Sequence, residues 1–130
     1  MPEKSRAVLV VEDDPEINEL VGAYVQIAGF DYHRALNGAQ AVAKARETHL
    51  SLIVLDIMLP DFDGFEVVRR LQSESSTRSI PIVMLTALDR DEYRQRGKSA
   101  GAVDYLTKPF DPERLLESIK ENASKNGSAK

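Results

Sequence analysis

Short hydrophobic runs alternate along the chain with longer stretches in which hydrophobic residues recur every three or four positions. A continuous hydrophobic run of four to eight residues is typical of a strand buried on both faces of a sheet, and the longer spacing is typical of an amphipathic helix. Four such runs and one weaker stretch, the second, predict strands at residues 7–11, 31–36, 51–56, 80–87 and 102–107.

Five helices are predicted to follow these strands. Asp14 and Pro15 supply an N-cap and the residue favoured at the first helical position, and Gly29 ends this first helix. The other helices are predicted after Asn37 as N-cap, around Phe65 to Leu71, over residues 89–99 and over residues 111–123. Strands that alternate with helices predict a parallel sheet covered on both faces, which right-handed crossovers make a doubly wound α/β fold.

The length of 130 residues fits one domain, which we expect to cover residues 1–124, with a disordered tail at 125–130. The net charge of −4 argues against binding of nucleic acid through bulk charge. The chain has no cysteine, which fits a reducing compartment, and its first hydrophobic run is too short for a signal peptide or a membrane span. We therefore expect a cytoplasmic domain that binds neither nucleic acid nor membrane directly.

Acidic residues follow two of the predicted strands. Glu12 and Asp13 come directly after the first strand, and Asp56 ends the third. The carboxyl ends of the strands form the site in such folds, so these carboxylates should meet at one edge of the sheet and repel one another. A hard divalent cation such as Mg²⁺, which prefers oxygen ligands, would neutralise them.

A hydroxyl group and an amine are expected at the same edge. Thr86 and Ala87 follow the fourth strand, and Thr107, Lys108 and Pro109 follow the fifth. A metal, an ammonium group and a hydroxyl group around a carboxylate are what phosphoryl transfer to that carboxylate requires. The pattern therefore favours phosphoryl transfer at this edge.

Other acidic residues are assigned structural roles. Asp14 and Asp111 each precede a proline and are interpreted as helix caps. Asp61 and Asp63 are interpreted as turn and cap residues ahead of the third helix.

Four segments together resemble the receiver domain of two-component response regulators, of the chemotaxis-regulator type. They are "LVVEDDPEI", "LIVLDIMLPDFDGFEV", "PIVMLTA" and "DYLTKPF", in the order and at the separations of that family, and the resemblance spans roughly residues 5–123. It implies a flavodoxin-like fold with strand order 2-1-3-4-5. It also implies a phosphoacceptor switch rather than an enzyme, with at most self-phosphorylation from small donors and self-dephosphorylation.

The resemblance implies a role for each matching position. Asp56 would accept a phosphoryl group from a histidine kinase or a histidine phosphotransfer protein. The expected ligands of Mg²⁺, or of Mn²⁺, are Glu12, Asp13, Asp56 and the backbone carbonyl of Met58.

The switch and the phosphate contacts also follow from the resemblance. Thr86 and Lys108 would contact the phosphoryl group, together with the backbone of Met58 and Ala87, and Thr86 and Tyr105 would report the phosphorylated state. The Lys108–Pro109 bond is typically cis in this family. A homodimer through the fourth helix, fifth strand and fifth helix is a further implied partner.

Three positions modify this expectation. Val103 stands where many relatives carry an aspartate, and it removes a surface carboxylate that is found in many dimerising DNA-binding regulators. Met58 and Leu88 match positions that tune access of the hydrolytic water in this family. Both are hydrophobic here, so we expect them to shield the acyl phosphate.

Three rival functions fit the sequence less well. An aspartyl-phosphate phosphatase carries a general acid two residues after its nucleophile, where this chain has Met58. A nucleotide module is suggested only by residues 97–99, and the first glycine of its P-loop would fall at Glu92. A pseudo-receiver, which would only bind partners, would not need the acidic set with Thr86 and Lys108.

Arg90, Arg94 and Lys98 recur every four residues on the predicted fourth helix. One interpretation is a solvated helix face. The other is a partner or dimer surface whose exposure depends on phosphorylation. His33 and His49 stand alone in the sequence and are interpreted as ordinary surface or partly buried residues.

Overall fold

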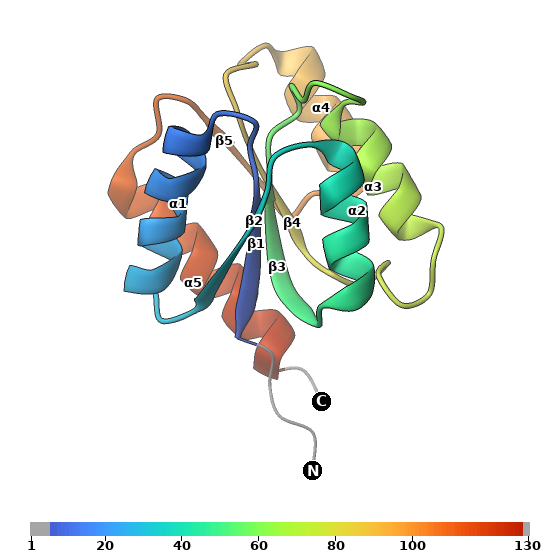
Figure 1. The fold of residues 1–130 in the computed structure, drawn as a ribbon. Helices are drawn as coiled ribbons and strands as arrows, with labels where there is room; N and C mark the ends of the chain where they lie inside the picture. The colour runs from blue at the N-terminus through green and yellow to red at the C-terminus, as the bar shows by residue number, and fades with distance from the viewer. Residues whose placement is uncertain (1–5, 129–130) are drawn as a thin grey trace.

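Five strands and five helices alternate through residues 6–128, the part of the chain that the computed structural model describes, with only the backbone described for 125–128 (Figure 1). The elements are β1 Ala7–Val11, α1 Pro15–Ile27, β2 Asp31–Ala35, α2 Gly38–Glu47, β3 Leu50–Leu55, α3 Gly64–Gln72, β4 Ile82–Thr86, α4 Asp91–Ala100, β5 Asp104–Thr107 and α5 Pro112–Ser128.

The strands form one parallel sheet in the order β2-β1-β3-β4-β5. Helices α1 and α5 cover one face, and α2, α3 and α4 cover the other (Figure 1). The predicted doubly wound, flavodoxin-like fold is therefore confirmed. Because the chain order reverses between β1 and β3, a site is expected at the carboxyl ends of these two central strands.

Alternation along the strands divides the core into two clusters. Leu9, Ile53 and Met84 pack toward α2 and α3, whereas Val10 and Val54 pack toward α1 and α5. Side chains of successive strand residues point to opposite faces, so a strand covered on both faces must be hydrophobic throughout. This explains the continuous hydrophobic runs, and every residue of β3 is buried.

Short polar side chains fix the helix starts that border the carboxyl edge. Asp14 accepts hydrogen bonds from the backbone nitrogens at positions 16 and 17, Asn37 from that at 40 and Asp63 from that at 66, as the sequence predicts. Asp61 lies in the bend ahead of α3, as predicted, but it also caps α2, which the sequence does not predict. Its carboxylate accepts from the backbone nitrogens of Gly38 and Ala39 at 2.8 and 2.9 Å.

Several boundaries differ from the predicted ones, most of them by one or two residues. The fifth strand begins at Asp104 rather than at 102, because the nitrogen of Ala102 donates to Gly97 and so belongs to the turn that ends α4. Helix α5 continues to Ser128, through residues that the pattern assigns to a disordered tail. Each residue added to a formed helix gains one backbone hydrogen bond, so a helix can continue beyond its last buried residues. Residues 129 and 130 lie outside the described part of the chain.

None of the helices in the described part of the chain is long and hydrophobic enough to cross a membrane.

Candidate functional site

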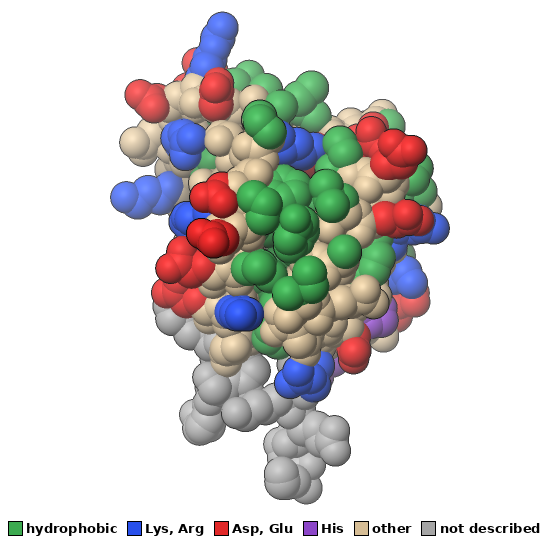
Figure 2. All heavy atoms as spheres, turned by 90° about the vertical axis from the view of Figure 1, so that its left-hand side faces the viewer, with side chains coloured by type: hydrophobic (Ala, Val, Ile, Leu, Met, Phe, Trp, Pro, Cys, Tyr) green, Lys and Arg blue, Asp and Glu red, His purple; other side chains and the backbone are tan. Residues whose placement is uncertain are grey.

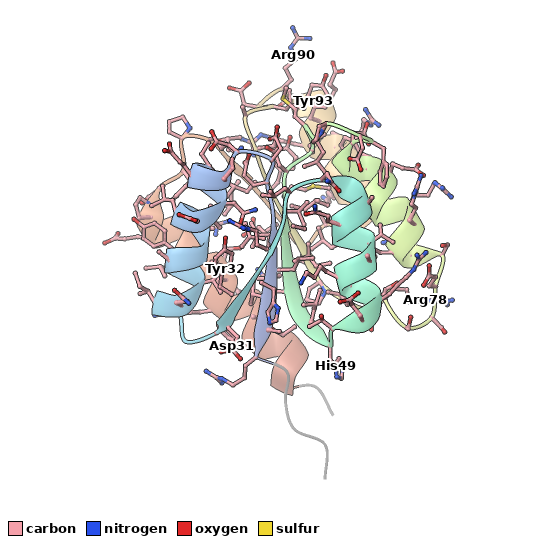
Figure 3. All side chains as sticks on the ribbon, in the orientation of Figure 1. Asp31, Tyr32, His49, Arg78, Arg90 and Tyr93 are labelled. Carbon is pink, nitrogen blue, oxygen red and sulfur yellow. The ribbon has the colours of Figure 1, made fainter. Side chains whose placement is uncertain are left out.

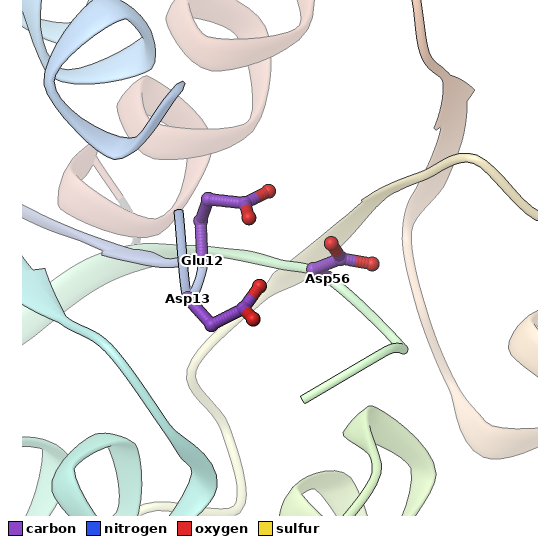
Figure 4. Close-up of side chains that lie close together, drawn as sticks. All are labelled: Glu12, Asp13 and Asp56. Carbon is purple, nitrogen blue, oxygen red and sulfur yellow. The ribbon is translucent and has the colours of Figure 1, made fainter. Parts of the chain in front are cut away.

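Three acidic side chains meet at the carboxyl ends of β1 and β3. The nitrogen of Asp56 donates to the carbonyl of Val11 at 3.0 Å, which continues the pairing of the two strands and sets Asp56 level with Glu12 and Asp13. Figure 4 shows the three side chains close together at the ends of the two strands. One carboxylate oxygen of each lies within 4.8 Å of the others. Glu12 and Asp56 are buried, whereas Asp13 is exposed.

Lys108 brings a positive charge to this cluster from the end of β5. Its backbone nitrogen donates to the carbonyl of Thr86 at 2.9 Å, which holds the loop against β4. Its ammonium group donates to Oδ2 of Asp56 at 2.8 Å and to Oε1 of Glu12. The Lys108–Pro109 peptide bond is cis, as the resemblance implies.

The second oxygen of each buried carboxylate is bonded by the backbone. Oδ1 of Asp56 accepts from the nitrogen of Met58 at 3.0 Å, and Oε2 of Glu12 accepts from the nitrogen of Asp14 at 3.0 Å. Among the described residues, no buried side-chain nitrogen or oxygen atom lacks a partner. The two buried carboxylates are therefore held in fixed orientations before any ligand arrives.

Burial and ion pairing oppose each other at this site. Burial raises the pKa of Glu12 above its ordinary value, although the hydrogen bonds from Lys108 and from the nitrogen of Asp14 act in the opposite direction. Burial alone would lower the pKa of Lys108, but its hydrogen bonds to Asp56 and Glu12 outweigh that effect and raise it. Lys108 therefore remains a cation at neutral pH.

The donor set fits a hard divalent cation. Three carboxylates outnumber the one ammonium group of Lys108. The cluster therefore carries more negative than positive groups in a partly buried space. Mg²⁺ and Mn²⁺ prefer carboxylate, carbonyl and water oxygens, and they tolerate a site that keeps several waters. The exposed side of the cluster, at Asp13, leaves room for those waters.

A second group of side chains meets in the loop between β4 and α4. Thr86 is fully buried, and its Oγ1 accepts from the nitrogen of Leu88 at 3.4 Å. The hydroxyl group of Tyr105 donates to the carbonyl of Leu88 at 2.6 Å. The guanidinium carbon of Arg94 lies 5.1 Å from the centre of the Tyr105 ring. Leu88 thus links the threonine and the tyrosine.

Comparison with known proteins decides the family. The sequence profile described as "Response regulator receiver domain" matches residues 8–120. The chain belongs to this receiver domain family. The resemblance drawn from the four sequence segments is therefore confirmed, and the chain is a signalling domain of two-component systems.

The receiver domain is similar to curated and solved relatives over most of its length. It is 44% identical over 116 residues to the phosphate regulon transcriptional regulatory protein PhoB of Escherichia coli, a match that covers 89% of this chain and 51% of PhoB. The chain thus spans about half the length of the curated relatives it matches.

Two solved structures share its fold. The chemotaxis protein CheY4 of Vibrio cholerae is 36% identical with a TM-score of 0.84, over 91% of this chain and 98% of that one. The receiver domain of the sensor histidine kinase PA1611 of Pseudomonas aeruginosa is 29% identical with a TM-score of 0.83, over 92% and 98%. The PA1611 receiver domain holds a magnesium ion that is coordinated in its active site cleft.

The fold of this receiver domain brings the predicted site residues into two connected groups, the acidic cluster and the group around Thr86 and Tyr105. Glu12, Asp13, Asp56 and Lys108 form the acidic cluster. Thr86 joins this cluster through its carbonyl, which accepts from the backbone of Lys108. Ala87 is exposed in the same loop. His49 lies at the opposite edge of the sheet and is exposed (Figure 3).

The sequence pattern does not single out Asn18, which the receiver domain buries completely beside the acidic loop. Its amide nitrogen donates to the carbonyls of Val10, Glu12 and Ala35 at 3.0 to 3.1 Å. One signal in the sequence could have found it, because a polar residue one turn after Asp14 occupies the inner face of α1 between Ile17 and Val21.

A hydrophobic groove of about 300 Å³ borders the acidic cluster on the side of α1. Figure 2 shows hydrophobic side chains gathered on this side of the molecule. Leu20 is 48% exposed there. The groove is lined by Ile17, Leu20, Tyr24, Lys108, Pro109, Phe110 and Pro112.

Proposed function

We propose that this receiver domain is a phosphorylation-dependent switch and that Asp56 is its phosphoacceptor. The observation that carries the proposal is the setting of Asp56, which is buried at the topological switch point and bonded by Lys108 and by the backbone of Met58. It also faces the carboxylates of Glu12 and Asp13. An acid in such surroundings is placed for attack on phosphorus rather than for solvation.

In the proposed transfer, a carboxylate oxygen of Asp56 forms a bond to phosphorus while the bond between phosphorus and the donor breaks. The donor is a phosphorylated histidine of a kinase or phosphotransfer protein, and its ring nitrogen keeps the electron pair of the broken bond. The ammonium group of Lys108, now on Oδ2 of Asp56, turns to the phosphoryl oxygens and offsets their charge. The nitrogens of Met58 and Ala87 contact the same oxygens.

The residues that would hold Mg²⁺ or Mn²⁺ are Glu12, Asp13, Asp56 and the backbone carbonyl of Met58. When bound, the metal supplies positive charge to the phosphoryl oxygens and lowers the repulsion between them and the carboxylates. The excess of carboxylates over ammonium groups in the cluster supports this assignment.

The switch runs through Thr86 and Tyr105. The hydrogen bond that Thr86 Oγ1 accepts is long, at 3.4 Å, so the hydroxyl group gives up little when it turns toward the phosphoryl group. That movement frees the backbone nitrogen of Leu88. The carbonyl of the same residue accepts the hydrogen bond from the Tyr105 hydroxyl group, so the two movements are linked. Tyr105 then reorients, and the balance between two states of the face formed by α4, β5 and α5 shifts.

The domain stores the phosphoryl group rather than turning over substrate. A phosphatase of this type uses an acid at the position of Met58, and a thioether cannot transfer a proton. Self-phosphorylation from small donors and slow self-dephosphorylation are the only reactions that we assign to the domain. Met58 is 56% exposed, and its backbone nitrogen bonds Asp56. We expect its side chain to restrict the approach of water to the acyl phosphate.

The groove beside Lys108 is the proposed docking site for the phosphodonor protein, in the cytoplasm. It combines an exposed hydrophobic surface on α1 with direct access to the acidic cluster. An occupant that buries Leu20 and Phe110 would carry its phosphorylated histidine to the edge of the site. Hydrophobic burial would thus supply affinity and the acidic cluster would supply the chemistry.

A second copy of the chain is the proposed partner of the face formed by α4, β5 and α5. Exposed cations lie on α4 at Arg94 and Lys98 and at its N-cap Arg90. Helix α5 presents Glu113 and Glu117 as exposed acids. A two-fold arrangement that sets α4 of one copy on α5 of the other would match these charges. Beryllofluoride with Mg²⁺ should shift the wild type toward dimer on a sizing column, and Arg90→Glu should abolish that shift.

The domain boundary at residue 124 and the output are also proposals. The curated relatives are transcriptional regulators by name and are about twice as long as this chain. Their names support a DNA-binding output that lies outside residues 1–124. The domain itself, with a net charge of −4 over the whole chain, is not proposed to bind nucleic acid.

The proposal is tested with beryllofluoride, a mimic of the phosphoryl group. Isothermal titration calorimetry should show binding to the wild type only when Mg²⁺ is present, and no binding to Asp56→Asn. Asp61→Asn is the matched control, since Asp61 caps α2 and should leave binding intact. Equal binding to wild type and Asp56→Asn would rule out Asp56 as the acceptor.

A further inference from the structure

Asn18 gathers three backbone carbonyls around one buried amide group. Its nitrogen lies 3.1 Å from the carbonyl oxygen of Val10, 3.0 Å from that of Glu12 and 3.0 Å from that of Ala35. An amide nitrogen carries two protons, so the three acceptors share them. Rotation of the amide by half a turn would point its oxygen at three carbonyl oxygens, so the structure permits one orientation.

Tyr32 supplies the fourth hydrogen bond of this amide group. Its hydroxyl group donates to Oδ1 of Asn18 at 2.5 Å, and Figure 3 shows the ring between β2 and α1. Burial raises the pKa of Tyr32, so the phenol stays protonated and acts as the donor. Without this hydroxyl group, Oδ1 would be a buried acceptor with no partner, which is costly.

Gly22 makes room for the Tyr32 ring. A Cβ atom at this position would lie 2.4 to 2.6 Å from three carbon atoms of the ring, far inside contact distance. Gly22 is buried in the middle of α1, where glycine is disfavoured relative to alanine. The close approach of the ring is therefore the physical reason for a glycine at this point of the helix.

The amide group closes the gap where the pairing of β1 and β2 ends. The last paired residues are Val11 and Ala35, and the nitrogen of Glu12 still reaches the carbonyl of Ala35 at 3.1 Å. Beyond this point the chain leaves the sheet and enters the acidic loop. Asn18 bonds both Ala35 and the carbonyl of Glu12, so it fixes the direction in which Glu12 and Asp13 leave the strand.

We propose that Gly22, Tyr32 and Asn18 form a positioning unit that holds the acidic loop in the geometry needed to bind a divalent cation. Asn18 acts on the backbone of Glu12, Tyr32 fixes the amide of Asn18, and Gly22 admits the ring of Tyr32. None of the three is a proposed ligand of the metal. The inference deepens the proposed function, on whose assignment of Glu12 and Asp13 as metal ligands it rests.

The unit predicts an effect on metal affinity that a purely structural role would not produce. A side chain that only stabilises the fold changes the fraction of folded protein, and the affinity of the folded protein stays constant. A side chain that positions ligands changes the affinity of molecules that are fully folded. Partners that orient ligands directly change metal affinity by roughly 10- to 100-fold. Since Tyr32 lies one hydrogen bond further from the metal ligands than Asn18, we expect it to change the affinity for the metal by a smaller factor.

The first test removes only the hydroxyl group, with Tyr32→Phe. Binding of Mg²⁺ alone is measured by isothermal titration calorimetry at a temperature where circular dichroism shows the variant to be fully folded. The dissociation constant should rise about three- to tenfold, at or below the low end for direct ligand partners. Tyr93→Phe is the matched control, because Tyr93 lies on α4, away from Tyr32, and should leave the constant unchanged (Figure 3).

The second test uses Gly22→Ala alone and together with Tyr32→Phe. Alanine should displace the ring and weaken Mg²⁺ binding about as much as Tyr32→Phe does. The double variant should then be no weaker than either single variant, because both changes remove the same hydrogen bond and their effects are not additive. Amide chemical shifts of Glu12 and Asp13, recorded without metal, should move in both variants and stay in place in Tyr93→Phe.

Each outcome bears on one proposal. Wild type that binds no Mg²⁺ would contradict the proposed metal ligands themselves. Wild type that binds Mg²⁺, with Tyr32→Phe binding equally well, would overturn only the positioning unit. Additive losses in the double variant would also overturn it, since they would show that Gly22 and Tyr32 act separately.

Discussion

The ammonium nitrogen of Lys108 lies 2.8 Å from Oδ2 of Asp56, although the two residues are separated by 52 positions in the sequence. Asp56 follows β3 and Lys108 follows β5, so the contact reaches across the end of β4. The same ammonium group bonds Glu12. Two buried carboxylates therefore depend on one cation, and several consequences can be measured.

Replacement of Lys108 by methionine should destabilise the protein and make its stability depend on metal. Removing one partner of a buried ion pair costs about 3–5 kcal/mol, because the remaining charge stays buried without compensation. Mg²⁺ should restore part of this loss and should stabilise the variant more than the wild type. Urea unfolding with and without Mg²⁺ measures both effects. Lys120→Met on the exposed face of α5 is the control. The same response to Mg²⁺ in wild type and Lys108→Met would contradict the account.

Polar residues at positions 58 and 88 should shorten the lifetime of the acyl phosphate. Met58 is exposed beside Asp56, and Leu88 is partly buried in the loop that follows Thr86. Met58→Asn and Leu88→Gln would admit and orient water at the acyl phosphate. We expect the rate of its hydrolysis to rise about threefold to tenfold, which corresponds to a modest change in the activation barrier. Release of inorganic phosphate from the purified phosphorylated domain gives the rate. A lifetime that stays constant in both variants would show that these side chains do not shield the site.

The pattern of the sequence predicted the fold because the three central strands, β1, β3 and β4, are buried on both faces. Continuous hydrophobic runs such as 52–55 are typical of strands in the interior of a sheet. Helix starts are marked by Asp14, Asn37 and Asp63, whose hydrogen bonds are local and span three residues or fewer. Placement of Glu12, Asp13, Asp56 and Lys108 at one edge follows from the parallel direction of the strands alone.

The sequence did not predict contacts that depend on distant segments. Asp61 looks like a local turn residue, yet its partners Gly38 and Ala39 lie more than 20 positions earlier. Asn18 and Tyr32 come from different elements, and only the fold shows that a glycine at position 22 lets them meet. Hydrophobic periodicity carries no information on such polar pairs, because they follow from packing and not from local spacing.

A negative charge at Leu20 should block transfer from a protein donor and spare transfer from a small one. Leu20→Glu places a carboxylate in the hydrophobic groove, and loss of a central hydrophobic contact should lower the transfer rate at least about tenfold. The probe is a phosphorylated kinase or phosphotransfer protein that transfers to the wild type, compared with acetyl phosphate. Ile27→Glu, on the same helix and outside the groove, is the control. Equal loss with acetyl phosphate would show damage to the site and contradict a docking role.

The stabilising effect of Glu66 should depend on pH. Hydrogen bonds from Arg69 and Arg70 lower the pKa of Glu66 from 4.5 to about 2. A lowered pKa in the folded state means that the stabilisation is present above the unfolded value and is lost as the pH falls from 4.5 to about 2. The urea midpoint of Glu66→Gln should thus lie below that of the wild type near neutral pH, and the two should converge in acid. Glu47→Gln is the control. A difference between the urea midpoints of the wild type and Glu66→Gln that persists at the lowest pH would show that the stabilisation does not come from the ion pairs of Glu66.

The proposed function depends above all on Asp56 as the acceptor of the phosphoryl group. Its most direct test is peptide mapping by mass spectrometry after incubation with acetyl phosphate and Mg²⁺, with borohydride reduction to mark the acyl phosphate. We expect a mark at Asp56 alone, dependent on Mg²⁺, and none in Asp56→Asn. A mark at Asp13 or Asp61 in the wild type, or undiminished phosphorylation of Asp56→Asn, would contradict this expectation.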